Sequence, residues 1–218
     1  MDNTTHHRAA RRPGSLLPRR AALTLFALLG AAVALLSARY FTGDPETFLE
    51  DQRATYLAHL TPLLLHIGGG TAALLLGPLQ FAARLRARRP AVHRFVGRAY
   101  LLSVAVTGVG GLVLAPHGLF PPIAPIGFGV LGVLLLGSSA AALQTARQRR
   151  FDRHRVWAVR SYALILAAVT LRVWLPLFDA LGAPFDQAYA AAGWTCWLIN
   201  LAVAEAFLQR RPAPVRAA

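Results

Sequence analysis

Seven histidines are the residues of this sequence best suited to hold a cofactor, and three of them stand out by position. His66 lies about nine residues into a long apolar segment, roughly 14 Å from its end if the segment is helical. An ionisable side chain this deep in an apolar segment is a candidate functional residue; a neutral histidine bonded to a neighbouring helix is the alternative. His93 and His154 each stand near the start of a further apolar segment.

A b-type haem needs two imidazoles that face each other from different helices at matching depth. His93 and His154 meet the depth condition, and Arg98 and Arg160, further along the same segments, would pair with the haem propionates. A quinone is the other redox cofactor that these histidines and His66 would bind. The simpler alternative is that His93 and His154 contact lipid phosphate.

A second haem, held by His59 or His66 together with His117, is a poorer hypothesis. The apolar segment 123–146 carries no histidine at all. Di-haem cytochromes of this general type place ligands on four central helices, so a segment without histidine argues against an outer haem.

Polar residues inside the apolar segments suggest a different kind of site, one for a small molecule or an anion. Arg172 lies near the far end of its segment, where Asp179 and Asp186 are the carboxylates nearest in depth. Candidate substrate contacts are Gln80, Tyr100, Tyr162 and Arg172. The alternative is that these side chains hold helices together.

The elements that carry these residues are predicted to be membrane helices. Of the 218 residues 56% are apolar and 15% are charged, against about a quarter charged in soluble domains. Six apolar runs reach the length of about 20 residues that crosses a bilayer. They cover residues 21–41, 57–83, 95–116, 123–146, 156–178 and 188–208. The first run is too long for a signal peptide and is interpreted as a retained span.

The arginines predict the orientation of this all-α, six-helix membrane bundle. All 23 basic residues are arginine, and twenty of them fall in the two tails, in the connections after the second and fourth runs, or just inside the adjoining segments. Arg39 and Arg53 lie on the other side, with most of the carboxylates. The positive-inside rule therefore predicts that both termini are cytoplasmic, in a bacterial inner membrane.

This interpretation also divides the chain. Residues 1–19 are expected to form a disordered basic tail, 20–209 the transmembrane domain and 210–218 a second cytoplasmic tail.

Arginines in short clusters between apolar runs do not predict a nucleic-acid surface. The sequence shows no phosphate-binding loop, catalytic triad, paired catalytic carboxylates or zinc spacing, so enzymatic activity is left open.

An internal repeat relates the two arginine-rich connections. Arg86, Arg88, Arg89, His93 and Arg94 match Arg147, Arg149, Arg150, His154 and Arg155 at an offset of 61 residues, and Arg98 and Tyr100 then match Arg160 and Tyr162 after one insertion. The central four segments are thus predicted to be a duplicated parallel hairpin with halves at about 57–116 and 118–178. Chance similarity between two positively charged loops is the alternative.

The segment 57–83 is rich in residues that disturb helices. It contains Gly68-Gly69-Gly70 and Gly77-Pro78. The interpretations left open are ordinary close packing, a kink, the close approach of a bulky cofactor or another backbone, and local unwinding in a transporter.

Several motifs together resemble a family of bacterial membrane proteins, the domain of unknown function 2306 (DUF2306). They are His66-x-Gly68-Gly69-Gly70, Leu76-Gly77-Pro78-Leu79-Gln80-Phe81, His93-Arg94-x-x-Gly97-Arg98-x-Tyr100, His154-Arg155-x-Trp157-x-x-Arg160-Ser161-Tyr162 and Thr170-x-Arg172. The resemblance covers about 57–205. It implies a multi-helix membrane fold, no stated activity, and a site at His66, Gln80, His93, Arg98, His154, Arg160 and Arg172.

Three functions remain open at this point. The first is transmembrane electron transfer with a bound haem or quinone. The second is transport or binding of a small anion, with Arg172 or Arg98 as its contact. The third is a membrane scaffold without a small ligand, whose partner is the lipid bilayer and another protein.

Overall fold

The computed structural model describes residues 16–209, and every regular element in this part of the chain is a helix. The α-helices are α1 (Leu16–Ala38), α2 (Glu50–Ala58), α3 (Leu60–Phe81), α4 (Ala83–Arg88), α5 (Pro90–Leu114), α6 (Ile123–Arg147), α7 (Phe151–Ile165), α8 (Ala167–Ala180) and α9 (Phe185–Gln209). Three short 3-10 helices accompany them: η1 (Arg39–Phe41), η2 (Pro45–Thr47) and η3 (Ala115–His117).

Six stretches of the described chain are long and apolar enough to cross a membrane, which confirms the predicted all-α, six-span fold. They are Ala21–Phe41, Leu60–Phe81, Pro90–His117, Ile123–Arg147, Phe151–Ala180 and Phe185–Gln209. α1 begins at Leu16, a few residues before the predicted start of the transmembrane domain. The rest of both predicted tails, residues 1–15 and 210–218, lies outside the described residues.

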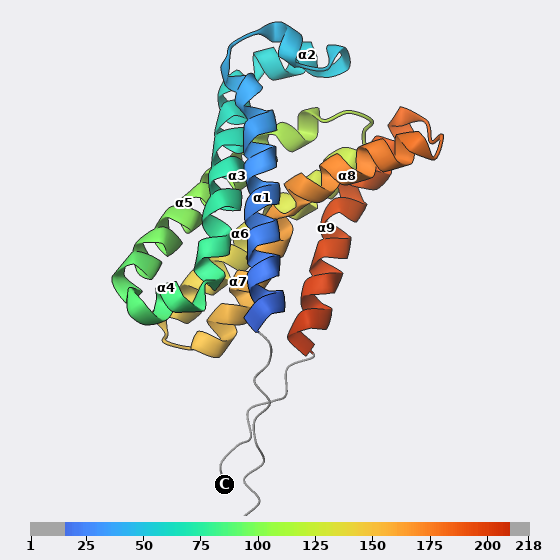
Figure 1. Ribbon diagram of the computed structural model, residues 1–218. Coiled ribbons are helices and arrows are strands. Elements are labelled where there is room, and N and C mark those ends of the chain that lie inside the picture. Colours follow the sequence, from blue (N-terminus) through green and yellow to red (C-terminus); the bar gives the residue numbers. More distant parts are fainter. Residues whose placement is uncertain (1–15, 210–218) are drawn as a thin grey trace, which may run out of the picture.

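The helices run up and down between two ends of different charge (Figure 1). We call the end formed by α4 and the α6–α7 turn, with Arg84–Arg94 and Arg147–Arg155, the arginine-rich end. The opposite end, formed by α2, η3 and the α8–α9 turn, carries Asp44, Glu46, Glu50, Asp51, Asp179 and Asp186; we call it the acidic end. α1 starts and α9 finishes at the arginine-rich end (Figure 1).

The predicted hairpins are formed by α3 with α5 and by α6 with α7, and α3 and α6 run in the same direction (Figure 1). α4 links the first pair, whereas a tight turn with Arg149 at a φ of 58° links the second. The architecture matches a parallel repeat, while the duplication itself stays a prediction.

The glycines of the second span serve close packing, and the described helix is not unwound there. α3 is continuous from Leu60 to Phe81. A Cβ atom added to Gly69 would lie 2.7 Å from the carbonyl oxygen of Ser103 and 2.8 Å from the amide of Thr107, both backbone atoms of α5. Only a glycine lets the two helices approach this closely.

The fifth span is interrupted at Leu166, where α7 ends and α8 follows. There is no proline at this point to explain the interruption. Asn200 of α9 donates a hydrogen bond from Nδ2 to the Ala163 carbonyl, at 3.2 Å. The hydroxyl of Thr170 donates to the Cys196 carbonyl at 2.6 Å. A side chain that bonds to the carbonyl ladder of a neighbouring helix is a recognised cause of such a bend.

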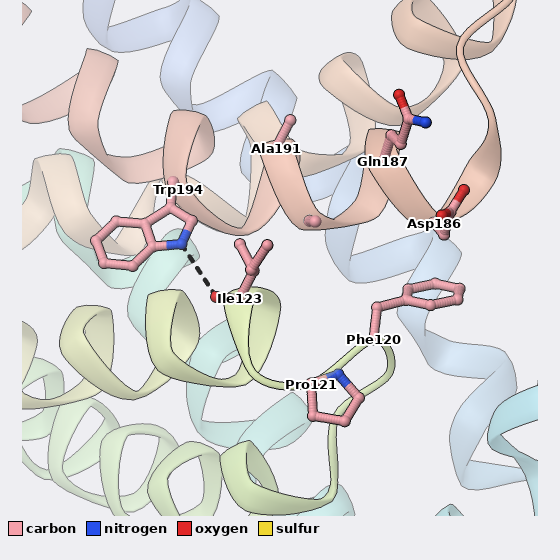
Figure 2. A pocket seen from close by; sticks show the side chains of 8 residues that line it. Phe120, Pro121, Ile123, Asp186, Gln187, Ala191 and Trp194 are labelled. Carbon is pink, nitrogen blue, oxygen red and sulfur yellow. Dashed lines mark hydrogen bonds between the residues drawn. The ribbon is translucent and has the colours of Figure 1, made fainter.

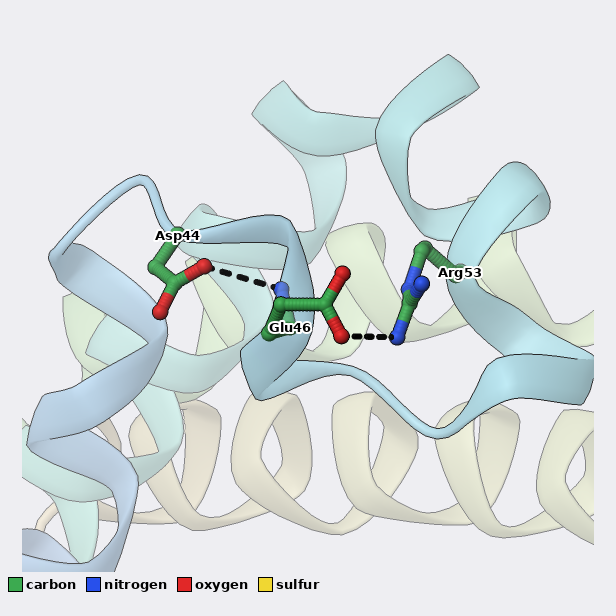
Figure 3. Close-up of polar contacts among 3 residues, drawn as sticks. All are labelled: Asp44, Glu46 and Arg53. Atoms are coloured by element: carbon green, nitrogen blue, oxygen red, sulfur yellow. Dashed lines mark hydrogen bonds and ion pairs between the residues drawn. The ribbon is translucent and has the colours of Figure 1, made fainter.

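At the acidic end, short polar contacts order the connection between α1 and α2 (Figure 3). An oxygen of Asp44 accepts a hydrogen bond from the Glu46 amide at 2.9 Å and so caps η2. Arg53 of α2 forms an ion pair with Glu46 at 2.8 Å. α2 is thereby tied to the loop that precedes it.

Candidate functional site

The predicted site residues divide between the two halves of the bundle. His66 and Arg172 lie in the acidic half, on α3 and α8. The others lie towards the arginine-rich end, on α3, α5 and α7: Gln80, His93, Arg98, Tyr100, His154, Arg160 and Tyr162. The structure therefore does not gather them into a single site.

At the arginine-rich end, two predicted residues have buried nitrogen atoms without a hydrogen-bond partner. They are Nδ1 of His93 and Nε2 of Gln80; among the described residues the only other such side-chain atom is Nε of Arg53, far away at the acidic end. Native structures leave few buried polar atoms unpaired, and each one needs an explanation such as a bound water or ligand. Two such atoms in one region therefore mark a candidate binding site.

The Gln80 side chain of α3 reaches α5 about one helical turn from His93. The Oε1 atom of Gln80 lies 3.0 Å from the position that a Cβ on Gly97 would occupy, and Gly97 is one helical turn beyond His93 on α5. Glycine at position 97 thus makes room for the Gln80 amide beside α5. His93 also lies within electrostatic range of His154, Arg86 and Arg94.

The hydrogen bond of His154 fixes its tautomer. Its Nδ1 lies 2.8 Å from the carbonyl oxygen of Ala142, which can only accept, so Nδ1 carries the proton. In the neutral ring Nε2 then carries no proton and can accept a hydrogen bond or bind a metal. His66 shows the same arrangement, with Nδ1 2.8 Å from the Thr107 carbonyl.

The contacts support a haem at only one of the two predicted inner ligands. Histidines that bind metal nearly always donate their second ring N–H to a carbonyl, a carboxylate or a water molecule. His154 does so, whereas Nδ1 of His93 has no partner. Of the two predicted outer pairs, His59 with His117 leaves no room for a porphyrin, because their rings contact each other directly with centroids 4.0 Å apart.

Arg160 has a partner that the sequence did not reveal. Its Nε and Nη2 atoms donate to the two carboxylate oxygens of Glu205 on α9, at 2.6 and 3.0 Å. The guanidinium also stacks on the ring of Trp157, 4.6 Å from the centroid. Counting residues from the arginine-rich ends of both helices would have placed Glu205 near Arg160. The arginine therefore holds α7 to α9, whereas Arg98 is exposed.

The two predicted tyrosines are used for packing. The hydroxyl of Tyr100 shares a hydrogen bond of 2.7 Å with Ser161, which shares another of 2.7 Å with Ser139. Tyr162 donates to the carbonyl oxygen of Leu74 at 3.3 Å. All four polar side chains are buried, so neither tyrosine faces an accessible site.

In the acidic half, Arg172 is placed without a carboxylate partner. It donates to the hydroxyl of Ser37 at 3.2 Å and to the Ala168 carbonyl at 2.7 Å. The two ion pairs of the described residues are Arg53–Glu46 and Arg160–Glu205, so neither Asp179 nor Asp186 pairs with it. His66, whose side chain is partly exposed here, lies within electrostatic range of this guanidinium.

Comparison with known proteins gives one finding. A family model described as a predicted membrane protein (DUF2306) matches residues 63–208. Neither the curated proteins nor the solved structures contain a significant match. The matched region takes in α3 to α9, and with them the candidate residues at both ends.

Proposed function

This chain belongs to the DUF2306 family of predicted membrane proteins, and we propose that it binds the head group of a membrane quinone at its arginine-rich end. The single observation that carries the proposal is the pair of buried, unpartnered nitrogen atoms of Gln80 and His93. An unpaired buried donor costs about 1–3 kcal/mol, which a ligand that accepts its hydrogen bond recovers.

The chemistry of a quinone suits the three polar side chains found there. Its carbonyl oxygens accept hydrogen bonds from the amide of Gln80 and the ring N–H of His93. The reduced quinol carries O–H groups instead, and Nε2 of His154 is the unprotonated atom that would accept from them. These side chains bind and orient the head group, while the quinone itself supplies the redox chemistry.

The location of the site agrees with a lipid-soluble ligand. Gln80, His93 and His154 lie at the ends of apolar helices, where a polar head meets the membrane surface and an isoprenoid tail extends into lipid. The arginine count assigns this surface to the cytoplasm of a bacterial inner membrane, with both termini on that side. The head group would then be reached from the cytoplasmic face.

Titration of the detergent-purified protein with decylubiquinone and a short-chain menaquinone analogue tests the proposal, with tryptophan fluorescence and thermal unfolding as readouts. We expect at least tenfold weaker binding in Gln80→Met and His93→Leu, since tenfold corresponds to about 1.4 kcal/mol, the order of one hydrogen bond. His117→Leu, at the acidic end, is the matched control and should bind normally.

Two outcomes would overturn the proposal. The first is equal affinity for all four proteins, or no binding by the wild type. The second is a Soret band in the visible spectrum of the purified protein that disappears in His93→Leu, which would assign the histidines to haem.

Binding of a small anion is a second candidate function, favoured by the guanidinium of Arg172, which has no carboxylate partner among the described residues. A charged side chain inside a membrane span is a candidate functional residue by default. We expect phosphate or small carboxylates to raise the melting temperature of the wild type and not of Arg172→Gln. An unchanged melting temperature across such anions would exclude this candidate.

A further inference from the structure

A hollow of about 590 Å³ lies at the acidic end, between the first turns of α6 and α9 (Figure 2). It is remote from the proposed quinone site, and no function has been assigned to it. The side chains that give it chemical character are Phe120, Trp194, Asp186 and Gln187. Figure 2 shows Phe120 beside Asp186 on one side of the hollow and Trp194 on the other.

The hollow carries a negative charge. Asp186 is the one ionisable residue that lines it, and its side chain is exposed. It takes part in neither of the two ion pairs of the described chain. Two exposed carboxylates at the same end of the bundle, Asp44 before α2 and Asp51 in the first turn of α2, add to the negative potential of this end. A cation is therefore attracted to the hollow.

The aromatic side chains are held rigidly in place. Phe120 has an unusual φ of 56°, and its ring packs edge-on against Phe185 and Tyr189 with centroids 5.7 and 5.9 Å apart. Trp194 donates from its indole nitrogen to the Ile123 carbonyl at 3.0 Å, which fixes its plane. Fixed aromatic rings beside a carboxylate are the usual recognition elements for organic ammonium groups.

The helix ends around the hollow do not favour an anion. A helix N-terminus attracts anions through free amide groups, but Pro122 at the N-cap of α6 and Pro125 in its first turn have no N–H to offer. The first turn of α9 already carries the carboxylate of Asp186. Both features favour a cation over an anion as the ligand of the hollow.

We propose that this hollow binds an alkylammonium group, with Asp186 as the counter-ion and the rings of Phe120 and Trp194 as contact surfaces. The ammonium belongs either to a soluble amine of the choline or ethanolamine type or to the head group of an aminophospholipid. Both have the same chemistry, and they differ in whether the ligand enters from water or from the bilayer.

Thermal unfolding in a maltoside detergent and phosphate buffer tests this proposal. Choline chloride is the soluble probe, and sodium chloride at the same concentration is the control. A second series compares nanodiscs of phosphatidylethanolamine with nanodiscs of phosphatidylglycerol. We expect stabilisation by choline or by phosphatidylethanolamine, and about tenfold weaker choline binding in Asp186→Asn. Asp179→Asn, an exposed carboxylate at the same end, is the matched control.

The outcomes separate the two sources. Stabilisation by choline in detergent identifies a soluble amine, and stabilisation confined to phosphatidylethanolamine identifies a lipid. A response to neither, or an equal response in Asp186→Asn, would overturn the proposal. If Asp186→Asn fails to fold, Phe120→Leu provides the same test, because it keeps the carboxylate and removes one aromatic surface.

Discussion

The hydroxyl of Tyr162 on α7 lies 3.3 Å from the carbonyl oxygen of Leu74 on α3 and donates a hydrogen bond to it. In a regular helix that carbonyl would accept from the amide of residue 78, but Pro78 has no N–H. Gly77 makes room for the ring, since a Cβ there would overlap the carbon atoms of Tyr162. Tyr162 therefore restores the hydrogen bond that Pro78 removes, and it joins the two predicted repeat halves.

This relationship predicts that Tyr162 and Pro78 are energetically coupled. Tyr162→Phe keeps the ring but leaves the Leu74 carbonyl unpaired, and we expect a loss of about 1 kcal/mol in the free energy of unfolding. In a Pro78→Ala background the new amide supplies the bond, so the same change should cost clearly less. Thermal unfolding of the four proteins measures the coupling, and an equal loss in both backgrounds would contradict it.

The close contact between α3 and α5 predicts opposite effects for two glycine substitutions. Gly69→Ala would force its Cβ against backbone atoms of Ser103 and Thr107, which cannot move separately from α5. We expect a destabilisation of about 1–3 kcal/mol. Gly137→Ala is the control on α6, because nothing lies within 4 Å of the added carbon; it should be neutral or stabilise by about 0.5–1 kcal/mol. Equal melting temperatures for the two variants would contradict the packing described for α3.

The ion pair between Arg160 and Glu205 predicts a measurable interaction between α7 and α9. Their side chains are 28% and 35% exposed, so the pair is only partly screened by solvent. A double-mutant cycle with Arg160→Gln and Glu205→Gln should give a coupling energy of about 1 kcal/mol. Arg160→Lys should lose most of it, because lysine cannot make the bidentate contact. Additive effects in the cycle would show that the two helices are held by other contacts.

The sequence predicted the six spans well because bilayer crossing depends on a local property, the length of the apolar runs. From the repeat it also predicted equal depths for His93 and His154, and each lies in the first turn of its helix. The partners of Tyr162, Arg160 and His66 could not be predicted, since they depend on how helices face one another. For the same reason Tyr100 and Tyr162, expected at a substrate, lie in the core.

The variant Gln80→Met tests whether Gln80 stabilises the fold or binds a ligand. Its amide nitrogen is buried without a partner, so Gln80→Met removes an unpaired donor at nearly constant volume. We expect the ligand-free protein to become more stable by about 1 kcal/mol while quinone binding weakens.

Asn200→Leu is the matched control for Gln80→Met, because the Asn200 amide donates to the Ala163 carbonyl and to Thr170. Removing a donor that has partners leaves those acceptors unpaired, so this variant should lose about 1 kcal/mol or more of stability and bind quinone normally. Thermal unfolding without ligand, followed by quinone titration, separates the two cases. A Gln80→Met protein that is destabilised like Asn200→Leu would show that Gln80 has a structural partner and would remove the main support for the quinone site.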